Sequence, residues 1–429
     1  MVLQIFYREC LAIMNLSNAA LGKIVAIATA ATITAVVVAG CISVTVSNQG
    51  RVIMGVQANG TTIAGLTKSE ARKFFTDTAA KKLQRKAAVL TYKERNFQID
   101  PADINLHGNV DKAVEAAYHI GRDGSPFENM ITQMRCAIFG ATVTMDASFD
   151  EQLLHDKLQQ IKTAIDTQPK NGSVTLLADG SIRKTPAVTG LSLDIDPIAA
   201  ELAPDFQTFN LTVKKELTPT EQLPFVQDSD LATMDGILGS YTTRFYPGDR
   251  GDNIGIAASH LQGALIRSVA TLSFNDTVGP RTHEAGYKDA GVIVYGEHTI
   301  DVGGGVCQVS STLYNAILLA GLTPVERTGH FASSSYVPAG RDATVADGLI
   351  DFVFRNPLPH PVYLTVANSG SALTVYVLGT KADLAGKSIA LVTEGSSMRP
   401  SLYRLWKQNG QVIEREFLHT DAYEPLKNT

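Results

Sequence analysis

Cysteine is scarce in this sequence. The 429 residues contain four cysteines, Cys10, Cys41, Cys136 and Cys307. The first two precede or lie within an apolar N-terminal run, which leaves Cys136 and Cys307 far apart in the body of the chain. So few cysteines exclude a disulfide framework, and no CxxC or Cys/His ligand spacing supports a metal site. We expect neither a metal nor an organic cofactor.

A strong charge of one sign is also lacking. The formal net charge is −5, with 45% hydrophobic and 18% charged residues. This composition is that of an ordinary globular protein, and the charge is too small to gather nucleic acid. The length allows two to four domains at about 100 to 200 residues each. Nucleic-acid binding is therefore not expected.

One long uncharged run stands out at residues 24–46, IVAIATAATITAVVVAGCISVTV. It is long enough to cross a bilayer core of about 30 Å. The leader carries Arg8 and Lys23 against Glu9, which predicts a cytoplasmic N-terminus. We predict a single-pass anchor in the cytoplasmic membrane, with the bulk of the chain outside the cell. A long signal peptide, or lipoprotein processing at VAGC with lipidation of Cys41, is the alternative.

The rest of the chain predicts an α+β fold with several domains. A T-x-x-E capping box, Thr67 to Glu70, begins a helix that precedes an alternating strand pair. Residues 99–114 align with residues 184–199 without a gap, which suggests two small α+β domains of similar plan. The predicted boundaries are a leader and anchor at 1–50, small domains at 51–140 and 141–217, a linker at 218–230, a mixed α/β domain at 231–380 and a β-hairpin extension at 381–429.

The domain at 231–380 is expected to hold two helices and a mostly antiparallel sheet. Asp252 or Asn253 is the expected cap of its first helix, and the second begins near Val306 with one apolar stripe. The segments that follow alternate in polarity, as sheet strands do. The extension is expected to turn at Asn409 and Gly410.

Cys307 follows three glycines at the start of the second helix. A helix N-terminus presents free N–H groups and a positive dipole end, which favour thiolate over thiol. Gly304 and Gly305 leave the sulfur approachable, and Gln308 is a candidate hydrogen-bond donor. A thiolate nucleophile needs a base, for which we select His330, with Asp342 as its orienting carboxylate. Alternatively, the glycines form a tight turn and Cys307 is a small packed residue.

Three further side chains are candidates for substrate binding. Arg281 and Arg327 would hold a peptide carboxylate by paired hydrogen bonds, and Tyr336 would line the pocket. The competing interpretation gives all three a structural role.

Residues 241–379 resemble the VanW family, named for an accessory protein of vancomycin-resistance clusters. The motifs include FYPGDRGDNIGIAASHLQGALI, GGGVCQVSSTLYNAILLAGL, YVPAGRDATV and DFVFRNPLPHPVYL. GLTKSEA and IDPADI are similar to peptidoglycan-binding domains that precede VanW domains and L,D-transpeptidases.

This resemblance implies that Cys307 is acylated by a peptidoglycan stem peptide, as in a cysteine L,D-transpeptidase, although the SHGC pattern of the better-known transpeptidases is missing. A weaker similarity to transglutaminase-like thiol enzymes would make His360 the partner histidine. A non-catalytic wall-binding scaffold is the alternative function.

Overall fold

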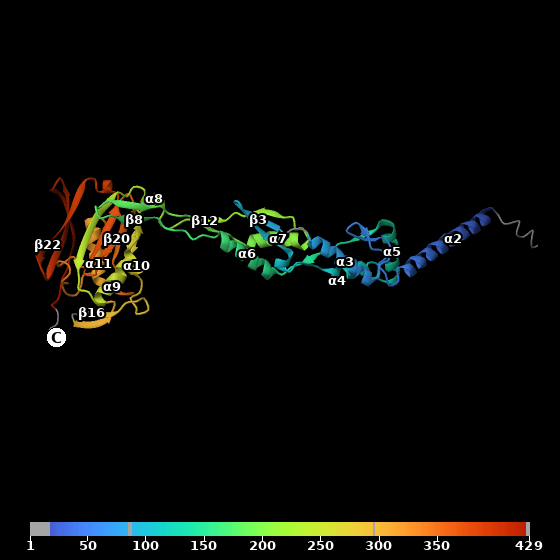
Figure 1. Cartoon of the computed structure of the whole chain (residues 1–429), viewed down its shortest axis with the longest axis horizontal. Helices are drawn as coiled ribbons and strands as arrows, with labels where there is room; N and C mark the ends of the chain where they lie inside the picture. Colours follow the sequence, from blue (N-terminus) through green and yellow to red (C-terminus); the bar gives the residue numbers. More distant parts are fainter. Residues whose placement is uncertain (1–17, 85–87, 295–296, 426–429) are drawn as a thin grey trace, which may run out of the picture. The chain divides into compact units, whose positions relative to one another are not determined.

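The computed structural model describes residues 18–84, 88–294 and 297–425. The chain forms two compact units (Figure 1). The first comprises Met1–Asp166 and Leu191–Thr220, and the second comprises Thr167–Gly190 and Glu221–Thr429. Both mix helices and strands, which confirms that level of the predicted fold class.

The N-terminal helix α2, Asn18–Ser47, contains the predicted apolar run. Its segment Gly22–Gly40 is long and apolar enough to cross a membrane. The hydroxyls of three threonines in this segment donate to carbonyls four residues earlier, which satisfies them without water. Arg8, Glu9 and Cys10 lie outside the described residues, as does the side chain of Cys41.

The first unit packs helices against short strands. Its capping box is confirmed, because Thr67 Oγ1 accepts from Glu70 N and Thr67 N donates to the Glu70 carboxylate. Its elements are α3 (Lys68–Leu83), α4 (Val110–His119), α5 (Pro126–Phe139), α6 (Glu151–Ile165), α7 (Asp196–Gln207), η1 (Pro101–Ile104), β1 (Val56–Ala58), β2 (Thr61–Thr62), β3 (Ala88–Tyr92), β4 (Arg95–Ile99), β5 (His107–Gly108), β6 (Ala141–Val143), β7 (Ala147–Ser148) and β11 (Lys214–Glu216).

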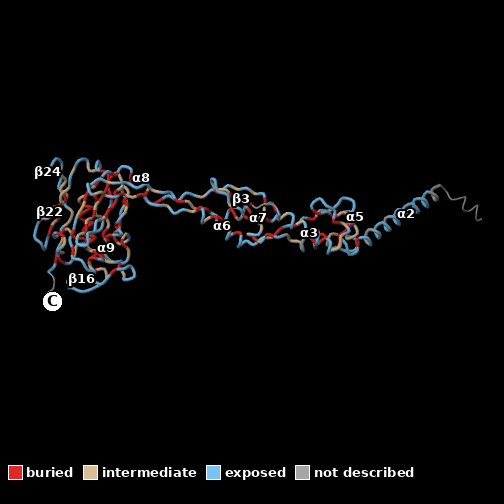
Figure 2. Tube along the Cα trace, viewed as in Figure 1, coloured by how far each residue is buried: buried red, intermediate tan, exposed pale blue. Residues whose placement is uncertain are grey.

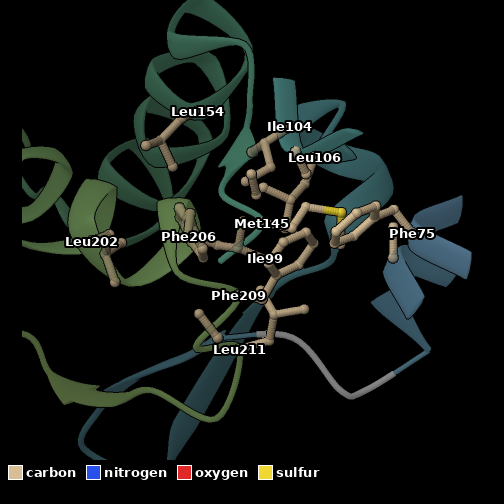
Figure 3. Close-up of a cluster of buried hydrophobic side chains, with 14 of the residues drawn as sticks. Phe75, Ile99, Ile104, Leu106, Met145, Leu154, Leu202, Phe206, Phe209 and Leu211 are labelled. Carbon is tan, nitrogen blue, oxygen red and sulfur yellow. The ribbon is translucent and has the colours of Figure 1, made fainter. Parts of the chain in front are cut away.

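One hydrophobic cluster fills this unit and draws on both predicted small domains. Phe75 from the first part of the unit and Phe206 and Phe209 from its last part belong to the same cluster (Figure 3). The order helix, strand pair, short strand, helix occurs at both 68–119 and 151–207. The second strand pair, β8 (Ser173–Leu176) with β9 (Ile182–Thr185), belongs to the other unit. The duplication and the boundary at 140 remain predictions.

The second unit contains a four-stranded antiparallel sheet in the order β13-β21-β20-β14. In Figure 2 many of the residues of this unit are drawn in red, the colour of buried residues. Its elements are β13 (Gly236–Arg244), β14 (Leu265–Ile266), β15 (Thr271–Ser273), β16 (Asp289–Val294), β17 (Glu297–Val302), β18 (Thr323–Glu326), β19 (Val353–Arg355), β20 (Val362–Asn368), β21 (Ala372–Gly379), β22 (Lys387–Ser396), β23 (Arg399–Gln408), β24 (Gln411–Thr420), α8 (Asp228–Leu231), α9 (Asp249–Leu261), α10 (Phe274–Val278), α11 (Val306–Leu319) and η2 (Lys381–Leu384).

Helix α11 forms the centre of this unit. It begins at Val306 as predicted. Every residue from 308 to 318 is buried, so the buried surface of the helix extends all round it and is wider than the single apolar stripe that we expected. The helix packs on β13 at Gly239, where a Cβ atom would lie 2.5 Å from the Ala320 backbone nitrogen and 2.7 Å from the Ala316 carbonyl oxygen. Only glycine lets the strand approach the helix so closely.

Helix α9 begins earlier than expected. Its first residue is Asp249, and Gly248 precedes it without a capping side chain. Asn253, one of the two expected caps, is instead buried within the helix. The helix ends at Leu261, where Gln262 takes an extended backbone conformation, and Leu265 and Ile266 then join the sheet as β14.

The predicted linker and C-terminal extension also differ from expectation. The linker region contains the short strand β12 (Thr220–Gln222) and the first residues of α8, and another short strand, β10, spans Gly190–Ser192. Val226 in this region is buried in a cluster with Val174, a contact that local polarity gave no sign of. The extension contains the predicted hairpin as β23 and β24, and β22 adds a third strand to it. Its last turn does lie at Asn409 and Gly410, whose φ angles are 51° and 83°.

We predict that Gly239→Ala destabilises the second unit by about 1 to 3 kcal/mol, because the added methyl group forces α11 away from β13. Gly291→Ala is the matched control, since no atom lies within 4 Å of a Cβ there. Urea unfolding of both variants measures the difference. Equal stability of the two would show that α11 moves without cost.

Candidate active site

The glycines before Cys307 form a tight backbone junction between three elements. Gly303 and Gly305 have φ angles of 78° and 111°, which favour glycine. A Cβ at Gly304 would lie 2.7 Å from the Ala290 carbonyl oxygen on β16. At Gly305 it would lie 2.9 Å from the Arg250 carbonyl oxygen on α9. Close packing on β16 and α9 therefore accounts for the glycines.

Asn253 holds this junction in place from inside α9. Its Nδ2 donates to the carbonyl oxygens of Gly304, at 3.0 Å, and Lys288, at 2.8 Å. Its Oδ1 accepts from the Lys288 backbone N–H at 2.8 Å. Three hydrogen bonds from one buried amide fix the loop from which α11 begins.

The structure brings together the three residues selected as a catalytic row. Cys307 is half-buried at the start of α11, with Sγ 3.4 Å from the Val345 carbonyl oxygen. The His330 imidazole lies close enough to this thiol to lower its pKa. His330 Nδ1 lies 2.6 Å from Asp342 Oδ2, and the same oxygen accepts from the His330 backbone N–H at 2.6 Å. The order is thiol, imidazole, carboxylate.

Electrostatics favour a charged pair between the first two members. Burial raises the pKa of Cys307, but the hydrogen bond and positive charge of His330 outweigh it and hold this pKa below its ordinary value. Burial lowers the pKa of His330, whereas Asp342 and Cys307 raise it to about 9 overall. Burial also acts to raise the pKa of Asp342, and His330 and Arg327 more than reverse this effect. The two groups therefore each favour the charged form of the other, thiolate beside imidazolium.

Asp342 is 1% exposed and has partners on both carboxylate oxygens. Its Oδ1 accepts from the Tyr423 hydroxyl and lies 3.4 Å from Arg327 Nη2. Arg327 Nε donates to the Asp342 backbone carbonyl at 2.6 Å, and its two terminal nitrogens pair with Asp421 at 2.5 and 2.8 Å. A buried carboxylate needs such partners to stay ionised.

Tyr423 and Asp421 were not among the predicted site residues. They follow β24, in the region expected to be a separate extension. His419 belongs to the same group, since its Nε2 lies 2.8 Å from the Tyr314 hydroxyl. Residues 419, 421 and 423 alternate along an extended segment and so share one side. In the sequence, the polar or ionisable side chains at every second position of this segment indicate that one of its sides packs against other polar groups.

The predicted binding arginines have partners within the protein. Arg281 pairs with Asp347 and donates to Asn275 Oδ1 at 2.6 Å. Arg327 is engaged by Asp421 and Asp342, behind the catalytic row. The predicted carboxylate-binding role therefore receives no support from their placement.

Gln308 is likewise turned inward, whereas Tyr336 lies at the site. Gln308 Nε2 donates to the Arg244 carbonyl at 2.9 Å and to Thr243 Oγ1 at 3.2 Å. The Tyr336 hydroxyl lies 3.3 Å from His330 Nε2, the nitrogen opposite Asp342. Burial raises the Tyr336 pKa, and the negative charge of Cys307 raises it further, so the phenol stays neutral.

The alternative histidine has a different partner. His360 Nδ1 lies 2.8 Å from Asp383 Oδ1, and the imidazole that lowers the pKa of Cys307 is that of His330. Within the described part of the chain, no group of three or more His, Cys, Asp or Glu is placed to hold a metal ion.

Comparison with known proteins finds matches for two segments of the chain. Residues 249–378 match the family model "VanW like protein", and residues 97–203 match "Putative peptidoglycan binding domain", a range that crosses the predicted boundary at 140. A 140-residue stretch, 32% of the chain, is 44% identical to "Uncharacterized protein YoaR" of Bacillus subtilis (strain 168), covering 46% of that protein. A 109-residue stretch, 24% of the chain, is 36% identical to "Vancomycin B-type resistance protein VanW" of Enterococcus faecalis (strain ATCC 700802 / V583), covering 40% of it.

The chain thus spans less than half the length of either relative. No solved structure matches. Cys307, His330 and Asp342 all fall within the first matched range, whereas Asp421 and Tyr423 lie beyond it.

We expect iodoacetamide to alkylate Cys307 with a midpoint below the pH of about 8.5 that is usual for a free thiol. The rate should fall as pH falls through the lowered Cys307 pKa. Since the His330 pKa is raised to about 9, the stability that the ion pair contributes should be lost as pH rises through that value. His330→Gln should move the alkylation midpoint upward. Cys136→Ala, which removes a buried thiol, should leave it unchanged; an ordinary midpoint in wild type would contradict the ion pair.

Tyr423→Phe should raise the alkylation midpoint of Cys307, because Asp342 loses a hydrogen-bond donor and orients His330 less firmly. The buried carboxylate oxygen loses a partner, so stability should fall by about 1 to 3 kcal/mol. Tyr246→Phe is the control, since Tyr246 is 90% exposed. If Tyr423→Phe lowers stability without moving the midpoint, Tyr423 serves the fold alone.

Proposed function

We propose, from the match of residues 249–378 to the VanW-like model and of residues 97–203 to the peptidoglycan-binding model, that the chain transfers peptidoglycan acyl groups through Cys307. The observation that carries the proposal is the row Cys307, His330, Asp342. A thiolate paired with an oriented imidazole is the arrangement that activates a cysteine for acyl transfer.

The reaction follows from the order of the three residues. The Cys307 thiolate attacks the carbonyl carbon of a stem-peptide amide, and the C–N bond breaks as His330 gives its Nε2 proton to the leaving amine. The product is a thioester on Sγ. An acceptor amine then loses a proton to His330 and attacks the thioester, forming a new amide and restoring the thiolate. Asp342 stays hydrogen-bonded to Nδ1 of the imidazole throughout, and the Tyr336 hydroxyl lies beside Nε2, the nitrogen that transfers the proton.

The first turn of α11 offers a donor for the oxyanion formed in each attack. Val306 N–H and Gln308 N–H donate to the carbonyls of Gly303 and Gly305, at 3.1 and 2.9 Å. Among the described residues, the Cys307 N–H between them has no such acceptor. A free amide beside the nucleophile, at the positive end of a helix, suits a developing negative charge.

The location we propose is the outer face of the cytoplasmic membrane, with α2 as a single-pass anchor. The apolar length of Gly22–Gly40 supports a membrane segment, and Lys23 against the uncharged run supports a cytoplasmic N-terminus. Peptidoglycan stem peptides are then the partners within reach. A cleaved signal peptide or a lipid on Cys41 would keep the same side of the membrane.

A non-catalytic wall-binding scaffold is the second candidate, and one observation favours it. Arg281, Arg327 and Gln308 are all engaged within the protein, so the selected substrate-binding groups other than the glycines and Tyr336 face no open site. In that case the glycine–cysteine junction serves packing alone.

Incubation of the full chain in detergent with a purified disaccharide-tetrapeptide should give a thioester adduct on Cys307, detected by intact-mass spectrometry and peptide mapping. Cys307→Ala should give none, and His330→Gln should slow its formation by about 10²- to 10⁴-fold. Cys136→Ala is the control and should react as wild type. If no adduct forms, and cells expressing wild type or Cys307→Ala have the same muropeptide crosslinks, the scaffold is the function.

A further inference from the structure

Helix α5 has the reverse of the usual amphipathic pattern. It buries Gln133 and Cys136, yet it exposes Phe127 by 66%, Ile131 by 48% and Ile138 by 69%. The three exposed residues are separated by four and seven positions and therefore lie on one helix face, which we call the apolar stripe. A helix of a soluble domain normally turns such a face toward the core.

The polar residue on the buried side has a specific reason to be there. Gln133 Oε1 accepts from Asn48 Nδ2 at 3.0 Å, and Gln133 Nε2 donates to the Gly121 carbonyl at 3.0 Å. Both ends of the buried amide are thus satisfied. These bonds fix the rotation of α5 about its axis, so the apolar stripe must face outward.

The same bonds attach α5 to the end of the candidate membrane helix. Asn48 directly follows Ser47, the last residue of α2, and its backbone carbonyl accepts from Arg122 Nη2 at 2.6 Å. Figure 1 shows α5 beside this end of α2. The candidate span ends at Gly40 and the uncharged run ends at Val46, so Asn48 lies about 3 to 12 Å of helix rise beyond the end of the span, near the membrane surface.

We infer that α5 lies at the membrane–water interface on the outer side of the cytoplasmic membrane, with its apolar stripe among the lipid acyl chains. The inference rests on the proposed anchoring by α2. We choose a lipid surface as the partner of the stripe because Gln133 of α5 is hydrogen-bonded to Asn48, the residue that directly follows the candidate membrane helix. Phe139, 80% exposed at the end of α5, and Met54, 51% exposed and hydrogen-bonded through its N–H to Asn48 Oδ1, add apolar surface at this level. An interfacial helix buries such a face at the boundary of headgroups and acyl chains.

Tryptophan quenching by brominated lipid tests this placement in the full chain. The background is Trp406→Phe, which removes the single native tryptophan. Ile131→Trp and Ile138→Trp are reconstituted separately into phosphatidylethanolamine–phosphatidylglycerol vesicles with or without brominated acyl chains. Gln160→Trp, at an exposed position of α6 in the same unit, is the control. Circular dichroism checks that each variant is folded.

The expected result is loss of emission in brominated vesicles for both stripe variants and none for Gln160→Trp. Emission unaffected by bromine at both stripe positions would overturn the inference. Blue-shifted but unquenched emission would also overturn it, because a protein surface would then cover the stripe. Alkaline carbonate extraction separates this failure from that of the anchor: a chain that stays with the vesicles but is not quenched refutes only the placement of α5.

Discussion

The ionised Asp342 carboxylate, almost without solvent contact, is the constraint on which the site depends. A buried carboxylate remains charged only when its oxygens have partners, and this one has His330 on one oxygen and Tyr423 with Arg327 on the other. Its charge raises the pKa of His330, and the imidazolium in turn lowers the pKa of Cys307. The charge of Asp342 therefore favours a protonated His330, and the protonated His330 favours an ionised Cys307.

Four segments distant in sequence must meet for this row to exist. Helix α11 supplies the sulfur, the loop after β18 supplies the imidazole and carboxylate, and the segment after β24 supplies the phenol of Tyr423. The α9 amide of Asn253 fixes the turn before the sulfur. Stability and chemistry are thus coupled, because the C-terminal sheet must be in place before the carboxylate has its full set of partners.

Local sequence patterns predicted the elements well where local physics decides. The capping box at Thr67 and the glycine turn before Cys307 each marked a helix start that the structure contains. Residues 307, 330 and 342 were selected on chemistry and short separation, and the structure places them together. Tyr423 was missed because its partner lies 81 residues away, a pairing that no local period encodes. Arg327 was misplaced because a charge in sequence does not reveal whether its partner is a substrate or a carboxylate such as Asp421.

The central claim is that Asp342 and the Cys307 thiolate together hold His330 as an imidazolium. Nitrogen-15 NMR of histidine-labelled protein, with the His330 resonance assigned by His330→Gln, observes this proton directly. The account predicts that both ring nitrogens carry a proton at neutral pH, and that Cys307→Ala lowers the pKa of this imidazole. A neutral ring that titrates near its ordinary value of about 6.5 in wild type would contradict it.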